Sequence, residues 1–163
     1  MIGGRLAEAS QADQIKGCFV FTVRALETKP DGKRVSDLLG LKIFRKIADQ
    51  LRADGFDITK PGPGSACAGA VEIRFPNFEV AAIILVDLSE AGMANCEVLT
   101  WCVRPFWRHP SPQEVSKGWI SVCSAIDKVL SEDPKVTSLY RLTENEAKVH
   151  WEKTSPRASV EHD

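Results

Sequence analysis

The sequence lacks the patterns that mark several common chemistries. It has no G-x-x-x-x-G-K-[ST] phosphate-binding loop, no C-x-x-C pair and no set of ligands at the spacing of a zinc site. Its internal histidines are His109 and His150, and nothing in the sequence places either beside a nucleophile. We therefore predict no catalytic residue, no metal and no cofactor.

Strong charge and long apolar runs are also missing. The formal net charge is -1, whereas a dedicated nucleic-acid or membrane binder is usually strongly basic over much of its surface. The apolar run at residues 18–23 is far too short to span a bilayer. Glu8 and Asp13 stand where a signal peptide would have a long apolar core. We expect a cytoplasmic protein that does not contact a membrane.

The cysteines do not indicate a disulfide framework. The chain has five of them: Cys18, Cys67, Cys96, Cys102 and Cys123. Their odd number and wide spacing are atypical of a small secreted scaffold and favour a reducing cytosol.

The composition is that of an ordinary soluble domain. Of the 163 residues, 44% are hydrophobic and 26% are charged, and this length favours one domain. We expect a polar N-terminal arm at residues 1–17, a single α+β domain at residues 18–152 and a polar tail at residues 153–163.

Helical spacing of apolar residues begins near Ser36, which we expect to be the N-cap, and stops at Gly55. The apolar residues that recur at this spacing are Leu39, Ile43, Ile47 and Leu51. The sequence therefore predicts a first long helix over residues 36–55.

Two capping boxes mark further helix starts. Ser111 precedes Glu114 by three residues, and Pro112 occupies the first helical position, where its missing N–H is not needed. Thr143 and Glu146 repeat the pattern for a short last helix. The sequence predicts helices after Ser111 and after Thr143.

Strand patterns lie before and between these helices. We expect strands at residues 18–26, 71–75, 78–88, 96–103 and 136–142. The run at 78–88 is apolar at nearly every position, which is typical of a central strand with both faces covered. The predicted fold is a two-layer α+β sandwich, with a mostly antiparallel sheet of about four to five strands and two main helices on one face.

Two helices on one side leave the second face of such a sheet to be covered by something else. The N-terminal arm and the last helix could cover it, or another chain could. A bare apolar face would be larger than monomers normally expose. This pattern therefore predicts a protein partner or a homodimer.

Residues 101–110, W-C-V-R-P-F-W-R-H-P, concentrate aromatic and arginine side chains, the types most enriched at binding hot spots. We interpret residues 101–103 as the end of a buried strand. The connection that follows supplies the predicted partner-binding residues, which are Arg104, Phe106, Trp107 and Arg108.

A Gly- and Pro-rich loop at residues 59–69 provides an alternative. Its candidate ligand-binding residues are Gly62, Gly64, Ser65 and Cys67. An enzyme or ligand-binding protein could use Cys67 or His109 in a pocket between this loop and residues 101–110. A cysteine in a loop without a nearby base is more often an incidental small residue.

A second alternative is a nucleic-acid-binding accessory protein. Its basic side chains would be Lys42, Arg45, Lys46 and Arg52 on the first helix. Asp49 interrupts them at ion-pairing distance along the helix, as on an ordinary solvated face, so nucleic acid is an unlikely partner. Our leading hypothesis is a non-catalytic cytoplasmic protein-binding domain, such as an immunity or antitoxin-type inhibitor or an assembly adaptor.

Overall fold

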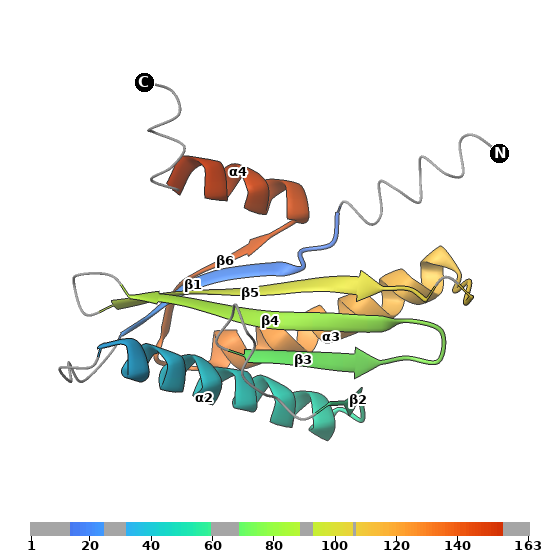
Figure 1. Cartoon of the computed structure of the whole chain (residues 1–163), viewed down its shortest axis with the longest axis horizontal. Coiled ribbons are helices and arrows are strands. Elements are labelled where there is room, and N and C mark those ends of the chain that lie inside the picture. The colour runs from blue at the N-terminus through green and yellow to red at the C-terminus, as the bar shows by residue number, and fades with distance from the viewer. Residues whose placement is uncertain (1–13, 25–31, 60–68, 89–92, 106, 155–163) are drawn as a thin grey trace.

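The computed structural model describes residues 14–24, 32–59, 69–88, 93–105 and 107–154. These residues form an α+β fold with one antiparallel sheet and three helices (Figure 1). In chain order the elements are β1 (Cys18–Arg24), α2 (Gly32–Ala53), β2 (Asp57–Ile58), β3 (Gly69–Arg74), β4 (Glu79–Leu88), β5 (Met93–Val103), α3 (Pro112–Glu132), β6 (Val136–Leu142) and α4 (Glu144–Thr154).

The sheet has six strands in the order β2-β3-β4-β5-β1-β6, and every neighbouring pair is antiparallel. The α+β class and the central position of β4 are confirmed. The expected count of four to five strands is too low because β2 was not foreseen. β2 consists of Asp57 opposite Arg74 and Ile58 opposite Ile73, and two residues are too few to show an alternating pattern.

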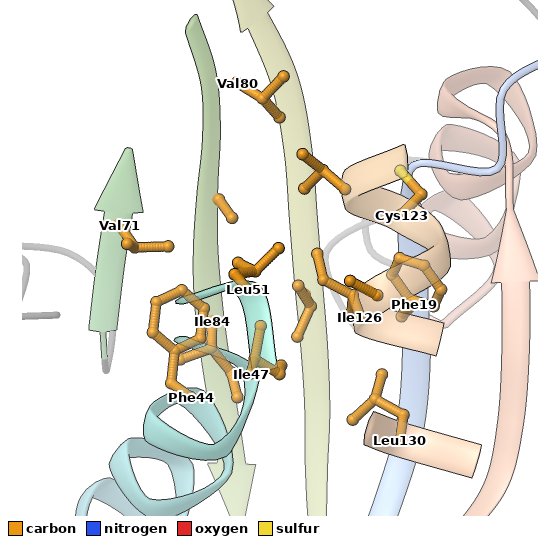
Figure 2. Packing of buried hydrophobic residues seen from close by; sticks show 14 of the residues in the cluster. Phe19, Phe44, Ile47, Leu51, Val71, Val80, Ile84, Cys123, Ile126 and Leu130 are labelled. Carbon is orange, nitrogen blue, oxygen red and sulfur yellow. The ribbon is translucent and has the colours of Figure 1, made fainter. Parts of the chain in front are cut away.

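Helices α2 and α3 pack side by side on one face of the sheet and enclose the core (Figure 1). Phe44 and Ile47 of α2 point toward Ile84 of β4, and Ile126 of α3 lies beside Phe19 of β1 (Figure 2). All five side chains are at most 1% exposed. At about 1.5–3 kcal/mol for each buried large apolar side chain, this interface is the main source of stability.

Helix α2 begins at Gly32, one turn before the predicted N-cap Ser36, which instead lies inside the helix. The residues at 33 and 34 are lysine and arginine, which favour helix, so the helix extends beyond its apolar stripe. Its end is as predicted. Gly55 has a φ of 90°, in the left-handed region that glycine tolerates, and the N–H of Phe56 donates to the carbonyl of Leu51 at 3.0 Å.

The two predicted capping boxes differ in detail. At α3, the Ser111 hydroxyl accepts from the N–H of Glu114 at 3.1 Å, while the Glu114 carboxylate accepts from Asn77 Nδ2 at 3.2 Å. At α4 the box is reciprocal: the Thr143 N–H donates to the Glu146 carboxylate at 3.1 Å, and the Glu146 N–H donates to the Thr143 hydroxyl at 3.2 Å. Glu114 therefore ties α3 to the β3–β4 turn rather than closing its own cap.

Helix α4 follows the edge strand β6 and lies at the side of the sheet opposite α2 (Figure 1). Lys16, just before β1, pairs with Glu146 of α4. Ile15, near the end of the predicted N-terminal arm, is buried in the core. Among the described helices, none is both long enough and apolar enough to cross a membrane.

Candidate functional site

The sheet face that points away from α2 and α3 carries an apolar surface, which we call the open face. Its apolar members on β1, β4, β5 and β6 are Val20, Ala81, Ile83, Leu85, Leu99, Trp101, Val103 and Tyr140. Alternation along β4 explains the division between the two faces. Val80, Ala82 and Ile84 face the helices and are fully buried, whereas Ile83 and Leu85, which alternate with them on the other face, are only half-buried.

The apolar side chains of the open face form continuous cross-strand rows. Ile83 stands opposite Leu99, and Leu99 stands opposite Cys18 on the next strand. In the neighbouring row, Ala81 stands opposite Trp101. Directly opposed side chains lie about 5 Å apart, so these residues make one surface rather than scattered exposed groups.

The structure corrects the prediction that residues 101–103 end a buried strand. Trp101 is 42% exposed and Val103 is 43% exposed, while only Cys102 between them packs against the core. Successive side chains of a strand point to opposite faces, so these residues could not all be buried once α2 and α3 covered a single face. Trp101 therefore belongs to the open face.

A cavity of about 370 Å³ opens at one end of the open face, where β5 runs past the start of β1 and α4 approaches. Its apolar lining comes from Ile15, Cys18, Leu99, Trp101, Trp119 and Ala147. The polar lining is Gly17, Thr100, Glu144 and Lys148, of which the last two pair at 3.8 Å. The cavity thus has an apolar interior and a charged pair on α4.

Hydrogen bonds hold the wall of this cavity. Trp119 Nε1 donates to the Thr100 hydroxyl at 2.8 Å, and that hydroxyl donates to the carbonyl oxygen of Gly17 at 2.7 Å. A Cβ at Gly17 would stand 2.8 Å from Thr100 Oγ1, closer than real Cβ atoms approach. Position 17 therefore has to be glycine for the chain to pass this close to β5 and α3.

The described charges of the open face are mainly acidic. Its carboxylates are Glu72, Glu79, Asp87 and Glu97, and its described basic side chain is Arg74. Arg74 stands in register with Asp57 on one side and Glu79 on the other.

Glu97 lies among apolar neighbours at the middle of the open face. It is only 9% exposed and stands in register with Leu85 on one side and Val20 on the other. Its negative charge reaches Cys18: burial raises the pKa of the Cys18 thiol to about 12, and the charges of Glu97 and Glu144 add to that rise.

The predicted partner-binding connection leaves the sheet beyond Val103. Arg104 is exposed, and Trp107 is 66% exposed. Arg108 Nη1 donates to the carbonyl oxygen of Pro76 in the β3–β4 turn at 2.5 Å, so this arginine anchors the connection. Phe106 lies outside the described residues.

The predicted ligand loop also lies outside the described residues, including Gly62, Gly64, Ser65 and Cys67. Burial raises the pKa of the remaining thiols, to about 12 for Cys18 and Cys96 and about 11 for Cys102 and Cys123. These thiols are protonated near neutral pH, which makes them poor nucleophiles. His109 is exposed and does not line the cavity beside Trp101.

A larger groove of about 830 Å³ runs along α3 on the other side of the sheet. It is lined mostly by polar side chains, and its most charged part is the pair formed by Arg141 and Asp127, at 2.5 Å and 2.7 Å. Lys16 of the same groove is paired with Glu146. Because these charged groups already have partners, we regard the open face as the stronger candidate despite its smaller cavity.

The predicted basic face of α2 is exposed, and it points away from the sheet. Its members are Lys42, Arg45, Lys46 and Arg52. Arg52 pairs with Asp49 at 3.4 Å, and Lys46 pairs with Asp133 at 3.1 Å. Burial alone would raise the pKa of Asp133, but hydrogen bonds from the Lys135 backbone and from Lys46 lower it overall. Part of this basic surface is therefore engaged within the chain.

Among the residues placed in the structure, no group of three or more His, Cys, Asp or Glu side chains converges as a metal site. No protein-family model matches the sequence, and no curated protein or solved structure matches it significantly either. The candidate site is thus defined by geometry and chemistry alone.

Proposed function

We propose that this protein is a non-catalytic binding domain whose open face is the docking surface for another protein. The observation that supports the proposal is the exposure of Trp101, 42%, near the end of the central strand β5, where it stands opposite Ala81 and next to the row of Ile83 and Leu99. Monomeric soluble proteins rarely leave large contiguous apolar surface in water, and such surface usually marks an interaction site. Tryptophan is also the residue type most enriched at binding hot spots.

The connection after β5 extends this surface at its rim. Arg104 and Trp107 are exposed there, directly beyond Val103 of the open face, while Arg108 holds the connection to the β3–β4 turn. Rim residues exclude water and set orientation, whereas central aromatic residues carry most of the affinity. We therefore place the energetic centre at Trp101 and assign an accessory role to Arg104, Phe106, Trp107 and Arg108. An immunity or antitoxin-type inhibitor or an assembly adaptor, in the cytoplasm, would use such a surface.

The test begins with a partner captured from the native host and identified by mass spectrometry, then produced separately. Its affinity is measured by calorimetry for the unmodified protein, for Trp101→Ala and for Ile120→Ala. Ile120 is a matched control because it is a large apolar residue of α3, 49% exposed, that lines the larger groove along α3 and not the cavity beside Trp101.

We expect Trp101→Ala to weaken binding by about 30- to 1,000-fold, the usual effect of removing a hot-spot tryptophan. Ile120→Ala should change the affinity by less than about threefold because surface truncations outside an interface are near neutral. The proposal fails if Trp101→Ala keeps its circular dichroism spectrum and binds the partner as tightly as the unmodified protein.

A further inference from the structure

The open face can receive only side chains, and this restricts the kind of partner segment that fits it. β4 and β5 are central strands, and each is paired on both sides, so their backbone groups are engaged in the ladders. An extended peptide that adds to a sheet needs a free edge, not a face. A helix can present a stripe of apolar side chains to a flat apolar surface. The open face therefore suits an amphipathic helix.

Charge then selects among amphipathic helices. The exposed described acids of the open face are Glu72 and Asp87, and Arg74 and Glu79 stand opposite each other at its edge. Of the two exposed acids, Glu72 flanks the row of Ala81 and Trp101, and Asp87 stands opposite Asn95, beyond the apolar rows. A helix with lysine or arginine flanking its apolar stripe would place positive charge over both.

The same charges disfavour a second copy of this chain as the occupant. Packing two open faces against each other would bring acidic side chains of one copy against those of the other, and like charges in contact are destabilising. The basic side chains of α2 lie on the opposite side of the molecule, and the described basic side chains at the edges of the face, Arg74, Arg104 and Lys148, are fewer than its carboxylates. The expected partner therefore differs from this chain in charge.

The cavity beside Trp101 offers a place for one large side chain of that helix. Its volume of about 370 Å³ exceeds the ~150 Å³ of an apolar cavity that is known to hold benzene. Trp101 forms part of both the cavity and the exposed row, so a helix lying on the open face would pass over the cavity mouth. An inserted leucine or phenylalanine would be enclosed between Trp101 and Trp119.

We infer that the open face binds a basic amphipathic helix of a partner protein, with one large apolar side chain of the helix inserted between Trp101 and Trp119. This inference rests on the proposed function and adds the chemical class of the partner. It concerns the charge and shape of the bound segment, which the test of the proposed function does not address.

Two synthetic peptides serve as probes. Both are about 20 residues long, enough to form a helix when bound, and share one stripe of leucine with a central phenylalanine. The remaining positions are lysine in one peptide and glutamate in the other. Binding to the full chain is followed by the anisotropy of a fluorescent label at low salt and at about 1 M salt, where the Debye length is only about 3 Å.

We expect the lysine peptide to bind at least about tenfold more tightly than the glutamate peptide at low salt, and the difference to shrink at high salt. Trp101→Ala should weaken binding of the lysine peptide by at least about tenfold. Equal binding of the two peptides, or tight binding to Trp101→Ala, overturns the inference. If the captured partner still depends on Trp101 in either case, the proposed function survives.

A matched pair of charge reversals locates the effect. Glu72→Lys alters an exposed acid on β3 of the open face, and Glu132→Lys makes the same change at an exposed position at the end of α3. Only Glu72→Lys should weaken binding of the lysine peptide, by about three- to tenfold. Because the two variants have the same net charge, a difference between them reports the position of the charge. Equal effects of the two reversals would contradict local recognition. A Trp101-dependent dimer in light scattering would also overturn the inference, because the occupant would then be a second copy.

Discussion

Replacing Thr100 with valine tests whether the cavity wall is held as the hydrogen bonds indicate. Thr100 is 9% exposed, and its hydroxyl accepts from Trp119 Nε1 at 2.8 Å while donating to the carbonyl oxygen of Gly17 at 2.7 Å. Valine has nearly the same shape but no hydroxyl, so the substitution removes these hydrogen bonds without leaving a void.

The Gly17 carbonyl and the Trp119 indole N–H both lose their hydrogen bond to the Thr100 hydroxyl, but only one of them keeps another partner among the described residues. The Gly17 carbonyl keeps the N–H of Thr100 as a donor at 3.0 Å, because that bond belongs to the backbone. The part-buried Trp119 indole N–H loses the Thr100 hydroxyl as its acceptor, and a polar group left without a partner away from water costs about 1–3 kcal/mol. We therefore expect Thr100→Val to lower the free energy of unfolding by about 2 kcal/mol, which is about 30-fold in the folding equilibrium.

Urea unfolding followed by tryptophan fluorescence and by far-ultraviolet circular dichroism measures this loss. A fall in Tm of about 4–8 °C should accompany it in a chain of this size. The matched control is Thr137→Val, because Thr137 also bonds across strands through its hydroxyl, at 2.7 Å to that of Thr22, but is exposed to water. We expect Thr137→Val to lower the free energy of unfolding by less than about 0.5 kcal/mol. A Thr100→Val variant as stable as the control would refute the reasoning.

Two further predictions concern α3. Gly118→Ala should destabilise the protein by about 1–3 kcal/mol in the same urea assay, although alanine favours helix by about 1 kcal/mol, because its Cβ would stand 2.6 Å from Phe78 and 3.1 Å from Phe75; a more stable variant would contradict the close packing. Hydrogen bonds from Arg141 lower the pKa of Asp127 below its usual 3.8, so this pair stabilises the fold above that pH and loses its effect as the pH falls through the lowered pKa. Arg141→Ala should thus cost less than about 1 kcal/mol at pH 7, since the pair is partly exposed, and progressively less as the pH falls through the lowered pKa; a loss that does not change with pH would show that packing, not charge, is responsible.

Local signals in the sequence were enough to predict much of the fold. The cap at Ser111 is a contact between residues three apart, and the structure contains it. The apolar run of β4 predicted a central strand because such a run has no wet face, and β4 is the third of six strands across the sheet. These features depend on neighbours in the chain or on one residue pattern.

Features that depend on distant parts of the chain were not predictable. Alternation placed Cys102 and Trp101 on opposite faces, but only the packing of α2 and α3 decides which of those faces is covered. The acceptor of Arg108 is the backbone carbonyl of Pro76, 32 residues away, and no pattern in the sequence indicates this contact. The sequence therefore predicts a site at the connection after β5, whereas the structure favours the open face that includes Trp101.

The two faces of β3 indicate that the apolar character of the open face is not required by the fold itself. On β3, the buried Val71 and Ile73 alternate with the exposed Glu72, which is the pattern of a strand whose outer side meets water. β4 and β5 lie under the same two helices, and only the inward residues of these two strands belong to the core. If their outer sides met only water, polar residues would serve there as they do on β3. Their apolar outer residues, with Trp101 as the largest, are therefore best explained by contact with another molecule.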